Sequence, residues 1–281
     1  MDYHLTLTGL QILLRTPHEI SISESLRPFL CPGKKDPDCT IALQSCHPLP
    51  ALPPDGAWHG PEYYSRQAGS LQIFHCHTPQ GTPFAVTELL EDGNIAISVL
   101  PECLSYFSGT AGIFNRIGLE TLLLQHKGLL LHASLINYCD KAIAFSGPSG
   151  VGKSTQAELW RVHSGAEIIN GDRAALRTGS GGWIAYGSPY AGTSGIYKNA
   201  HAPLAAIVLL QQGAENQLCR LTPAEAFPRL YPELTIHHWD KTFVSAATDL
   251  CLQLLTETPV YLLVCRPEES AVQLVKKGLG L

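Results

Sequence analysis

The segment from Gly147 to Ser154 has the residue types and the spacing of a phosphate-binding loop. It reads GPSGVGKS and matches the pattern G-x-x-x-x-G-K-[ST]. Glycines let backbone N–H groups approach phosphate oxygens, and Lys153 is placed to reach the β- and γ-phosphates of a nucleotide. The Ser154 hydroxyl is placed to bind Mg²⁺. We therefore expect ATP to bind with Mg²⁺ through Gly147, Ser149, Gly150, Val151, Gly152, Lys153, Ser154 and Thr155.

The sequence on both sides of this loop agrees with the motif. Residues 142–145 form a short apolar run that predicts a buried strand, and residues 155–161 predict a helix that ends near Gly165. A helix in that position directs its N-terminal partial positive charge at the bound phosphates. The alternative is a glycine-rich turn that binds no ligand. The complete match to G-x-x-x-x-G-K-[ST], together with the predicted strand before it and the predicted helix after it, argues against this alternative.

Two further residues have chemistry that a nucleotide site can use. His132 lies on the predicted strand before the loop strand, and Asp172 follows the next predicted strand, residues 167–170. Phosphoryl transfer needs a group that orients or deprotonates the accepting hydroxyl, and a carboxylate near Mg²⁺. We expect His132, Lys153 and Asp172 to be catalytic, and Ser154 and Asp172 to hold the metal. The alternatives are a turn or cap residue for Asp172 and a satisfied core histidine for His132.

Composition narrows the class of protein. The chain of 281 residues has a formal net charge of −5 and 45% hydrophobic residues, which predicts one large domain or two modest ones. It has no Lys/Arg cluster and no run of 18 apolar residues, so neither a nucleic acid nor a membrane is an expected partner. The N-terminus lacks the features of a signal peptide, and an ATP-type site suits a reducing cytoplasm, where the nine cysteines stay free thiols.

A group of thiols and imidazoles in the first third of the chain is an alternative site for a metal. Its spacings match no compact zinc finger, so we expect buried or loop thiols there rather than zinc. The group comprises Cys31, Cys39, Cys46, His47, His75, Cys76 and His77.

Hydrophobic periodicity divides the chain into two regions. Residues 1–125 are predicted to be β-rich, with strands over 5–10, 71–74 and 95–99 and a helix over 113–125. This region has no chemical motif, and three roles are open for it: to cap the nucleotide site, to bind the substrate, or only to cover a sheet edge. We expect it to form or support a module for the acceptor side of a reaction.

Residues 126–281 are predicted to form the nucleotide-binding domain. A strand over 129–136 and a turn at 137–141 predict a hairpin that leads into the loop strand. Strands mixed with helices predict an α/β architecture. The remaining expected elements are strands over 174–177, 183–186, 204–210 and 260–264, a capping box at 222–225, and helices over 240–255 and 267–277.

Three stretches carry a resemblance to a known family: HASLI at 132–136, FSGPSGVGKS at 145–154 and IINGD at 168–172. They resemble the C-terminal catalytic domain of bacterial HPr kinase/phosphorylase, a serine kinase of sugar-transport regulation. The resemblance covers about residues 129–175. It implies a P-loop fold related to that of phosphoenolpyruvate carboxykinase, a histidine before the loop, a pair of aspartates after it, and a homo-oligomer.

The chain also departs from that family. Gly171 stands where the family has its first aspartate, so only Asp172 remains of the pair. The family's later signature with a metal-binding glutamate is replaced by GSPYAGTSGIYK at 187–198. This loop either wraps a phosphate or substrate or simply connects two strands, with Lys198 and His201 as candidate contacts. The chain therefore looks like the HPr kinase-like proteins found outside sugar-transport regulation, and the acceptor stays open.

Two functions remain open from the sequence. The first is an ATP-dependent kinase that transfers a phosphoryl group to a hydroxyl, serine-like, of a peptide, a protein or a small metabolite. The second is a nucleotide-sensing module without phosphotransfer, which the missing aspartate and glutamate motivate. Asp172 discriminates between them, because a sensor has no need of a carboxylate at that position.

Overall fold

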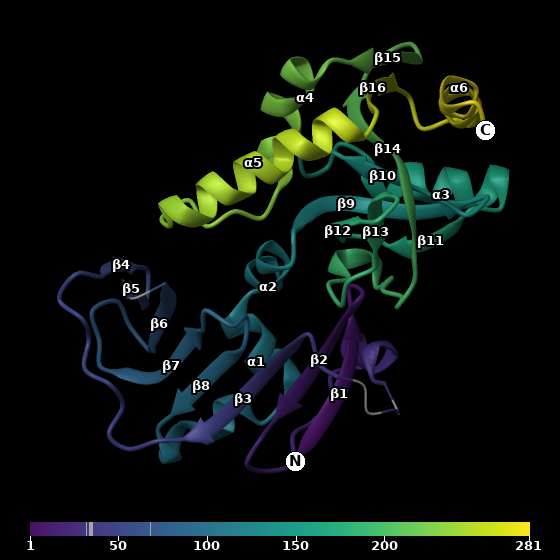
Figure 1. Ribbon diagram of the computed structural model, residues 1–281. Coiled ribbons are helices and arrows are strands. Elements are labelled where there is room, and N and C mark those ends of the chain that lie inside the picture. The colour runs from purple at the N-terminus through teal and green to yellow at the C-terminus, as the bar shows by residue number, and fades with distance from the viewer. Residues whose placement is uncertain (32, 34–35, 68) are drawn as a thin grey trace. The chain divides into compact units, whose positions relative to one another are not determined.

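The computed structural model describes residues 1–31, 33, 36–67 and 69–281, and the chain divides into two compact units, Met1–Leu122 and Leu123–Leu281 (Figure 1). Each unit contains an eight-stranded sheet, so the protein is mixed α/β. Within the described residues, no helix combines the length and the apolar character needed to cross a membrane.

The first unit is a mixed sheet with the strand order β1-β2-β3-β8-β7-β6-β5-β4. Its strands are β1 (Asp2–Leu7), β2 (Leu10–Arg15), β3 (Cys39–Ser45), β4 (Ala57–His59), β5 (Glu62–Gln67), β6 (Ser70–Cys76), β7 (Pro83–Leu89) and β8 (Ile95–Val99). Its short helices are η1 (Glu24–Phe29), η2 (Pro101–Phe107) and α1 (Thr110–Ile117), and α2 (Leu119–Gln125) leads into the second unit.

Two expected elements of the first unit are wrong in detail. The alternation over 5–10 is not one strand, because the chain turns between β1 and β2 at Thr8 and Gly9, with φ of 53° and 78°. Positive φ at both central residues is what a type I′ hairpin turn requires. The helix expected over 113–125 is divided into α1 and α2, because Gly118 has φ of 74° and cannot continue a right-handed helix.

The thiols and imidazoles of the first third lie on several strands and loops of the first unit. Among the described residues, no three His, Cys, Asp or Glu side chains gather in a way that suits a metal ion. Cys39 and Cys76 are buried in strands instead. His75 is also buried, and its ring nitrogens contact the side chains of Glu62 and Thr87 at 3.1 and 2.9 Å.

The second unit is built around three neighbouring parallel strands, β10, β14 and β16. Its strands are β9 (Gly128–Tyr138), β10 (Lys141–Ser146), β11 (Glu167–Asn170), β12 (Arg173–Gly179), β13 (Gly182–Tyr186), β14 (His201–Gln212), β15 (Gln217–Leu221) and β16 (Val260–Cys265). Its helices are α3 (Lys153–Ser164), η3 (Gly192–Ser194), α4 (Pro223–Leu230), η4 (Tyr231–Glu233), α5 (Lys241–Glu257) and α6 (Glu269–Leu279).

Helices cover both faces of these parallel strands (Figure 1). Ile143 and Phe145 of β10 pack with Trp160 of α3 and with α6. Ala142 and Ala144, on the other face of the same strand, belong to the core that α4 and α5 close. Such an apolar strand, buried on both faces, is typical of parallel α/β sheets.

The expected hairpin that leads into the loop strand is confirmed. β9 pairs antiparallel with β10, and the two-residue turn at Cys139 and Asp140 has φ of 50° and 56°. The first half of β9 pairs instead with β12, with His132 opposite Arg173. Because β9 pairs with β10 and also with β11, it brings the segment after β11 next to the segment after β10. The capping box at Thr222 and Glu225 is also confirmed.

Candidate functional site

The glycine-rich loop lies between β10 and α3, in the strand–loop–helix order expected from the sequence. It follows the carboxyl end of β10, the edge of a parallel sheet at which α/β proteins bind ligands. Gly147 and Gly152 have φ of 140° and 114°, which side chains other than glycine rarely adopt. Ser154 and Thr155 are exposed in the first turn of α3. The loop thus presents hydroxyls and a helix N-terminus at this edge.

Lys153 is folded back onto the loop. Its Nζ donates hydrogen bonds to the carbonyl oxygens of Gly147, at 2.7 Å, and Pro148, at 3.2 Å. The residue is only 8% exposed, and this burial lowers the pKa of the ammonium group, against the opposing influence of Glu233 and Asp172. An ammonium group held by two carbonyl oxygens at the base of the loop is a compact cation of the kind that binds phosphate oxygens.

Asp172 is held at the end of β11 by a buried amide. The Oδ1 of Asn170 accepts the N–H groups of Asp172 and Arg173 at 2.8 and 2.7 Å. The Nδ2 of Asn170 donates to the carbonyl oxygens of Ser188 and Tyr190 at 2.9 and 3.0 Å. Asn170 has no exposed surface, so its orientation is fixed by these bonds. The backbone that carries the Asp172 carboxylate is therefore rigidly supported.

His132 lies between two carboxylates. Its Nε2 is 3.5 Å from Oδ1 of Asp172, and its Nδ1 is 3.3 Å from Oε2 of Glu233. Burial and the charge of Lys153 lower the pKa of His132, although Asp172 and Glu233 act in the opposite direction. Arg173 adds a longer contact, with its Nε 3.8 Å from Oδ2 of Asp172. We call Lys153, His132, Asp172 and Glu233 the charged cluster.

Sequence reasoning missed Glu233. It comes from η4, far along the chain, and no local pattern marks it. Two backbone contacts bring it to His132: a bridge between Leu234 and Leu131, and a hydrogen bond from the Thr235 N–H to the Leu130 carbonyl at 2.9 Å. The side chain is only 11% exposed. The pairing of the segment after Glu233 with β9 involves residues about 100 positions apart in the chain, so the sequence around Glu233 carries no signal for it.

The loop over residues 187–198 packs closely on Asp172 and its neighbour. A Cβ added at Gly192 would lie 2.8 Å from the Asp172 Cβ, and one added at Gly171 would lie 1.9 Å from the Ser194 Oγ. A side chain therefore has no room at position 171, where the resembling family has an aspartate. Of the two expected contacts in this region, Lys198 pairs with Glu167 at 2.8 Å and His201 stacks on Tyr186. In the described contacts neither joins the charged cluster.

Among the described residues, two cavities adjoin the glycine-rich loop. The larger, of about 430 Å³, lies between residues 150–152, the first turn of α3 and the ends of β14 and β16, where Gln212 donates to the Gly150 carbonyl at 3.3 Å. The smaller, of about 210 Å³, lies between Gly147, Pro148 and the α4–η4 segment. Both are at the carboxyl ends of the parallel strands, so both suit ligands of the loop.

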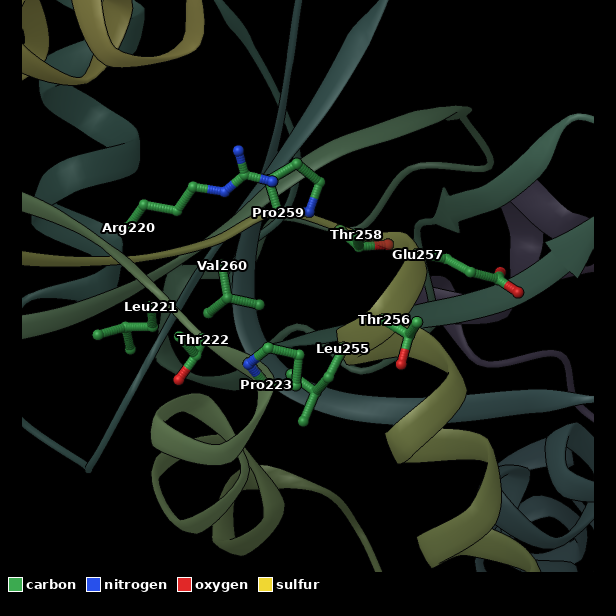
Figure 2. A pocket seen from close by; sticks show the side chains of 10 residues that line it. All are labelled: Arg220, Leu221, Thr222, Pro223, Leu255, Thr256, Glu257, Thr258, Pro259 and Val260. Atoms are coloured by element: carbon green, nitrogen blue, oxygen red, sulfur yellow. The ribbon is translucent and has the colours of Figure 1, made fainter.

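A third cavity, of about 390 Å³, is far from this chemistry (Figure 2). It is lined by Val260 at the first position of β16, by the start of α4 at Thr222, and by the end of α5 at Leu255. Because β16 runs parallel to β10, the first residue of β16 lies at the sheet edge opposite to the glycine-rich loop.

The donor set fits Mg²⁺ by its chemistry. Ser154 offers an exposed hydroxyl, and Asp172 offers a carboxylate that is 29% exposed. Magnesium in nucleotide sites is held by one or two carboxylates with phosphate oxygens and water rather than by a complete protein cage.

Comparisons with known proteins place the chain far from characterised ones. No family model matches it, and no curated protein matches it. Among solved structures, the Hpr(Ser) kinase/phosphatase from Coxiella burnetii matches with a TM-score of 0.31 and 11% identity, over 54% of this chain and 92% of that one. This is a distant likeness over about half the chain, and the function proposed below rests on residues of this chain alone.

Proposed function

We propose that the second unit binds ATP with Mg²⁺ and transfers the γ-phosphoryl group to a hydroxyl of a serine-like acceptor. The glycine-rich loop and Lys153 hold the phosphates, and Ser154 and Asp172 hold the metal. When bound, Mg²⁺ neutralises charge on the β- and γ-phosphates. The larger cavity, beside residues 150–152, receives the nucleoside, because it adjoins the loop at the base of α3 and has the volume of a small-molecule site.

The proposed chemistry is a direct displacement. The acceptor oxygen bonds to the γ-phosphorus, the bond from that phosphorus to the β,γ-bridging oxygen breaks, and ADP leaves with the electron pair. The hydroxyl proton passes to a carboxylate oxygen of Asp172. Lys153 stabilises negative charge on the transferred group, and His132 keeps the Asp172 carboxylate in position.

One observation carries this proposal: a carboxylate and an ammonium group converge at the same end of the sheet as the loop. The Asp172 carboxylate acts to raise the pKa of Lys153 against the effect of burial. Asn170 fixes the backbone of Asp172, and His132 contacts its carboxylate at 3.5 Å. A loop that only senses a nucleotide requires no such supported carboxylate. The sensor remains the second candidate because Gly171 leaves no room for the other aspartate of the resembling family.

Binding and chemistry are tested separately. Lys153→Ala removes a charge-assisted contact worth ~1.5–3 kcal/mol, so calorimetry with Mg²⁺ should show ATP affinity weakened by roughly tenfold or more. Lys198→Ala is the matched control, because that ammonium group pairs with Glu167 instead. Equal ATP affinity in the wild type and Lys153→Ala would contradict the proposed nucleotide site.

A further inference from the structure

Arg173 is a charged residue beside the site that has no role in the proposed displacement. Its strand β12 pairs with β9, and there Arg173 lies opposite His132. On the other side of β9, Ser146 of β10 lies opposite Ala133, so the next residue, Gly147, continues the row beside His132. Neighbouring strands are about 4.8 Å apart, which places the Arg173 and Gly147 backbones about 10 Å from each other. An extended arginine side chain spans most of that interval.

The backbone of Arg173 is held at both of its polar groups. Its N–H donates to Oδ1 of Asn170 at 2.7 Å, and its carbonyl oxygen accepts the Ser188 hydroxyl at 2.6 Å. Neither partner has any exposed surface, so water does not compete for these bonds. The side chain therefore starts from a rigid backbone, which suits a group that must be in place before a reaction begins.

The guanidinium group of Arg173 is anchored by a neutral partner rather than by a carboxylate. Its Nη1 donates to the hydroxyl of Thr235, in the segment that follows η4. Its Nε is 3.8 Å from Oδ2 of Asp172, which is too far for a hydrogen bond. In the contacts of the described residues Nη2 has no partner, and 37% of the side chain is exposed. The group thus keeps donors for an incoming anion.

The end of η4 and the residues that follow it position the groups on both sides of Asp172. Glu233 contacts the His132 ring at 3.3 Å, and Thr235, two residues later, binds the Arg173 guanidinium. The imidazole faces Oδ1 of Asp172 and the guanidinium faces Oδ2. Because backbone contacts tie this segment to β9, the guanidinium is held beside the carboxylate that acts in the proposed chemistry.

We propose that Arg173 is a catalytic residue that donates hydrogen bonds to the non-bridging oxygens of the transferred phosphoryl group. The inference rests on the proposed function and adds a residue to its chemistry. Bonds form and break as in the proposed displacement, and the guanidinium gives up no proton, because arginine stays charged in proteins. A planar guanidinium matches two phosphoryl oxygens at once, whereas the Lys153 ammonium group acts as a point charge. An arginine in this role contributes ~10³–10⁵-fold to kcat in phosphoryl-transfer enzymes.

The test replaces the transferred group by aluminium fluoride, so that no acceptor is needed. Aluminium fluoride bound beside MgADP mimics the phosphoryl group in the transition state. Calorimetry measures the affinity for MgADP with and without aluminium fluoride in the wild type, Arg173→Ala and Arg177→Ala. Arg177 is the matched control, because it lies four residues further along β12 on the same face and donates to the His126 carbonyl at 3.3 Å.

In the wild type, aluminium fluoride should tighten MgADP binding by at least about 100-fold, the lower end for transition-state analogues. Arg173→Ala should lose at least about tenfold of that tightening, while its affinity for MgADP alone stays within about twofold. Arg177→Ala should keep the full tightening. Thermal unfolding of the variants shows whether they remain folded. If Arg173→Ala does not, Arg173→Lys carries the same comparison, because it keeps the charge and loses the planar fork.

An equal tightening in Arg173→Ala and in the wild type would overturn the inference and leave the proposed function in place. That result would favour a contact of Arg173 with an anionic group of the acceptor, which these samples lack. An equal loss of affinity with and without aluminium fluoride would also overturn it, because Arg173 would then support the nucleotide site as a whole. A wild type that binds MgADP with no tightening by aluminium fluoride would instead contradict the proposed phosphotransfer, and the role of Arg173 with it.

Discussion

Glu233 Oε2 lies 3.3 Å from His132 Nδ1, although the two residues come from η4 and β9. Nδ1 is the ring nitrogen that does not face Asp172, so this contact fixes how the imidazole presents its other nitrogen. Histidines at functional sites are commonly oriented by a carboxylate in this way. The relationship makes Glu233 a positioning residue for the group that touches Asp172.

Glu233→Gln should lower phosphotransfer while ATP binding persists. Glutamine keeps the size and the hydrogen-bonding capacity of the side chain but removes the charge that supports His132. Loss of such an orienting partner costs about 10–100-fold in activity. Steady-state kinetics of Glu233→Gln and of the exposed control Glu215→Gln measure this effect. An unchanged rate in Glu233→Gln would exclude a positioning role.

His132 should make the protein sensitive to acid. The pKa of His132 in the folded protein is lowered from its ordinary value of 6.5, chiefly by burial. The folded state therefore binds this proton less readily than the unfolded state does, and stability falls as the pH drops below 6.5. Urea unfolding from about pH 7.5 down to about pH 5 should show a smaller loss of stability in His132→Gln than in the wild type. An equal loss of stability in His132→Gln and in the wild type would exclude this role of His132.

Gly171→Ala should destabilise the second unit and impair transfer. The new Cβ would lie 1.9 Å from Ser194 Oγ and 2.5 Å from Ser194 Cβ, so the loop over 187–198 or the Asp172 backbone has to move. Overpacking of this kind costs about 1–3 kcal/mol in free energy of unfolding. Gly181→Ala is the control, because its Cβ would meet no atom within 4 Å. In thermal unfolding, Gly171→Ala should melt at a lower temperature than Gly181→Ala. Equal melting temperatures of the two variants would refute the close packing at position 171.

The sequence predicted the parts of this site that depend on local order. The hairpin into the loop strand, the helix after Lys153 and the strand before Asp172 each follow from a short pattern of apolar residues and turns. Local patterns of this type need no knowledge of distant pairing.

Other features depend on contacts between distant parts of the chain. Glu233 reaches His132 because the segment at Leu234 pairs with β9. The sequence near Glu233 contains no pattern that predicts this pairing. In the first unit, β3 pairs in parallel with β8 across more than one intervening hairpin, an order that strand propensity alone does not specify. β15 was not expected either, because its five residues, QLCRL, are mostly exposed and show little apolar periodicity.

The role of Asp172 is the central claim, and Asp172→Asn tests it most directly. Asparagine keeps the size of the side chain and can still contact His132, but it cannot take the proton of the acceptor hydroxyl. General-base assistance contributes ~10²–10⁴-fold to rate. We expect phosphotransfer from ATP to fall by that order. If the carboxylate acts mainly by holding Mg²⁺, the affinity for Mg²⁺–ATP will fall together with the rate.

The decisive measurement is therefore the single-turnover rate of phosphotransfer by Asp172→Asn at saturating Mg²⁺–ATP, with ATP affinity determined by calorimetry on the same sample. The account predicts a rate lower by ~10²–10⁴-fold with ATP still bound. An undiminished rate in Asp172→Asn would contradict the proposed mechanism.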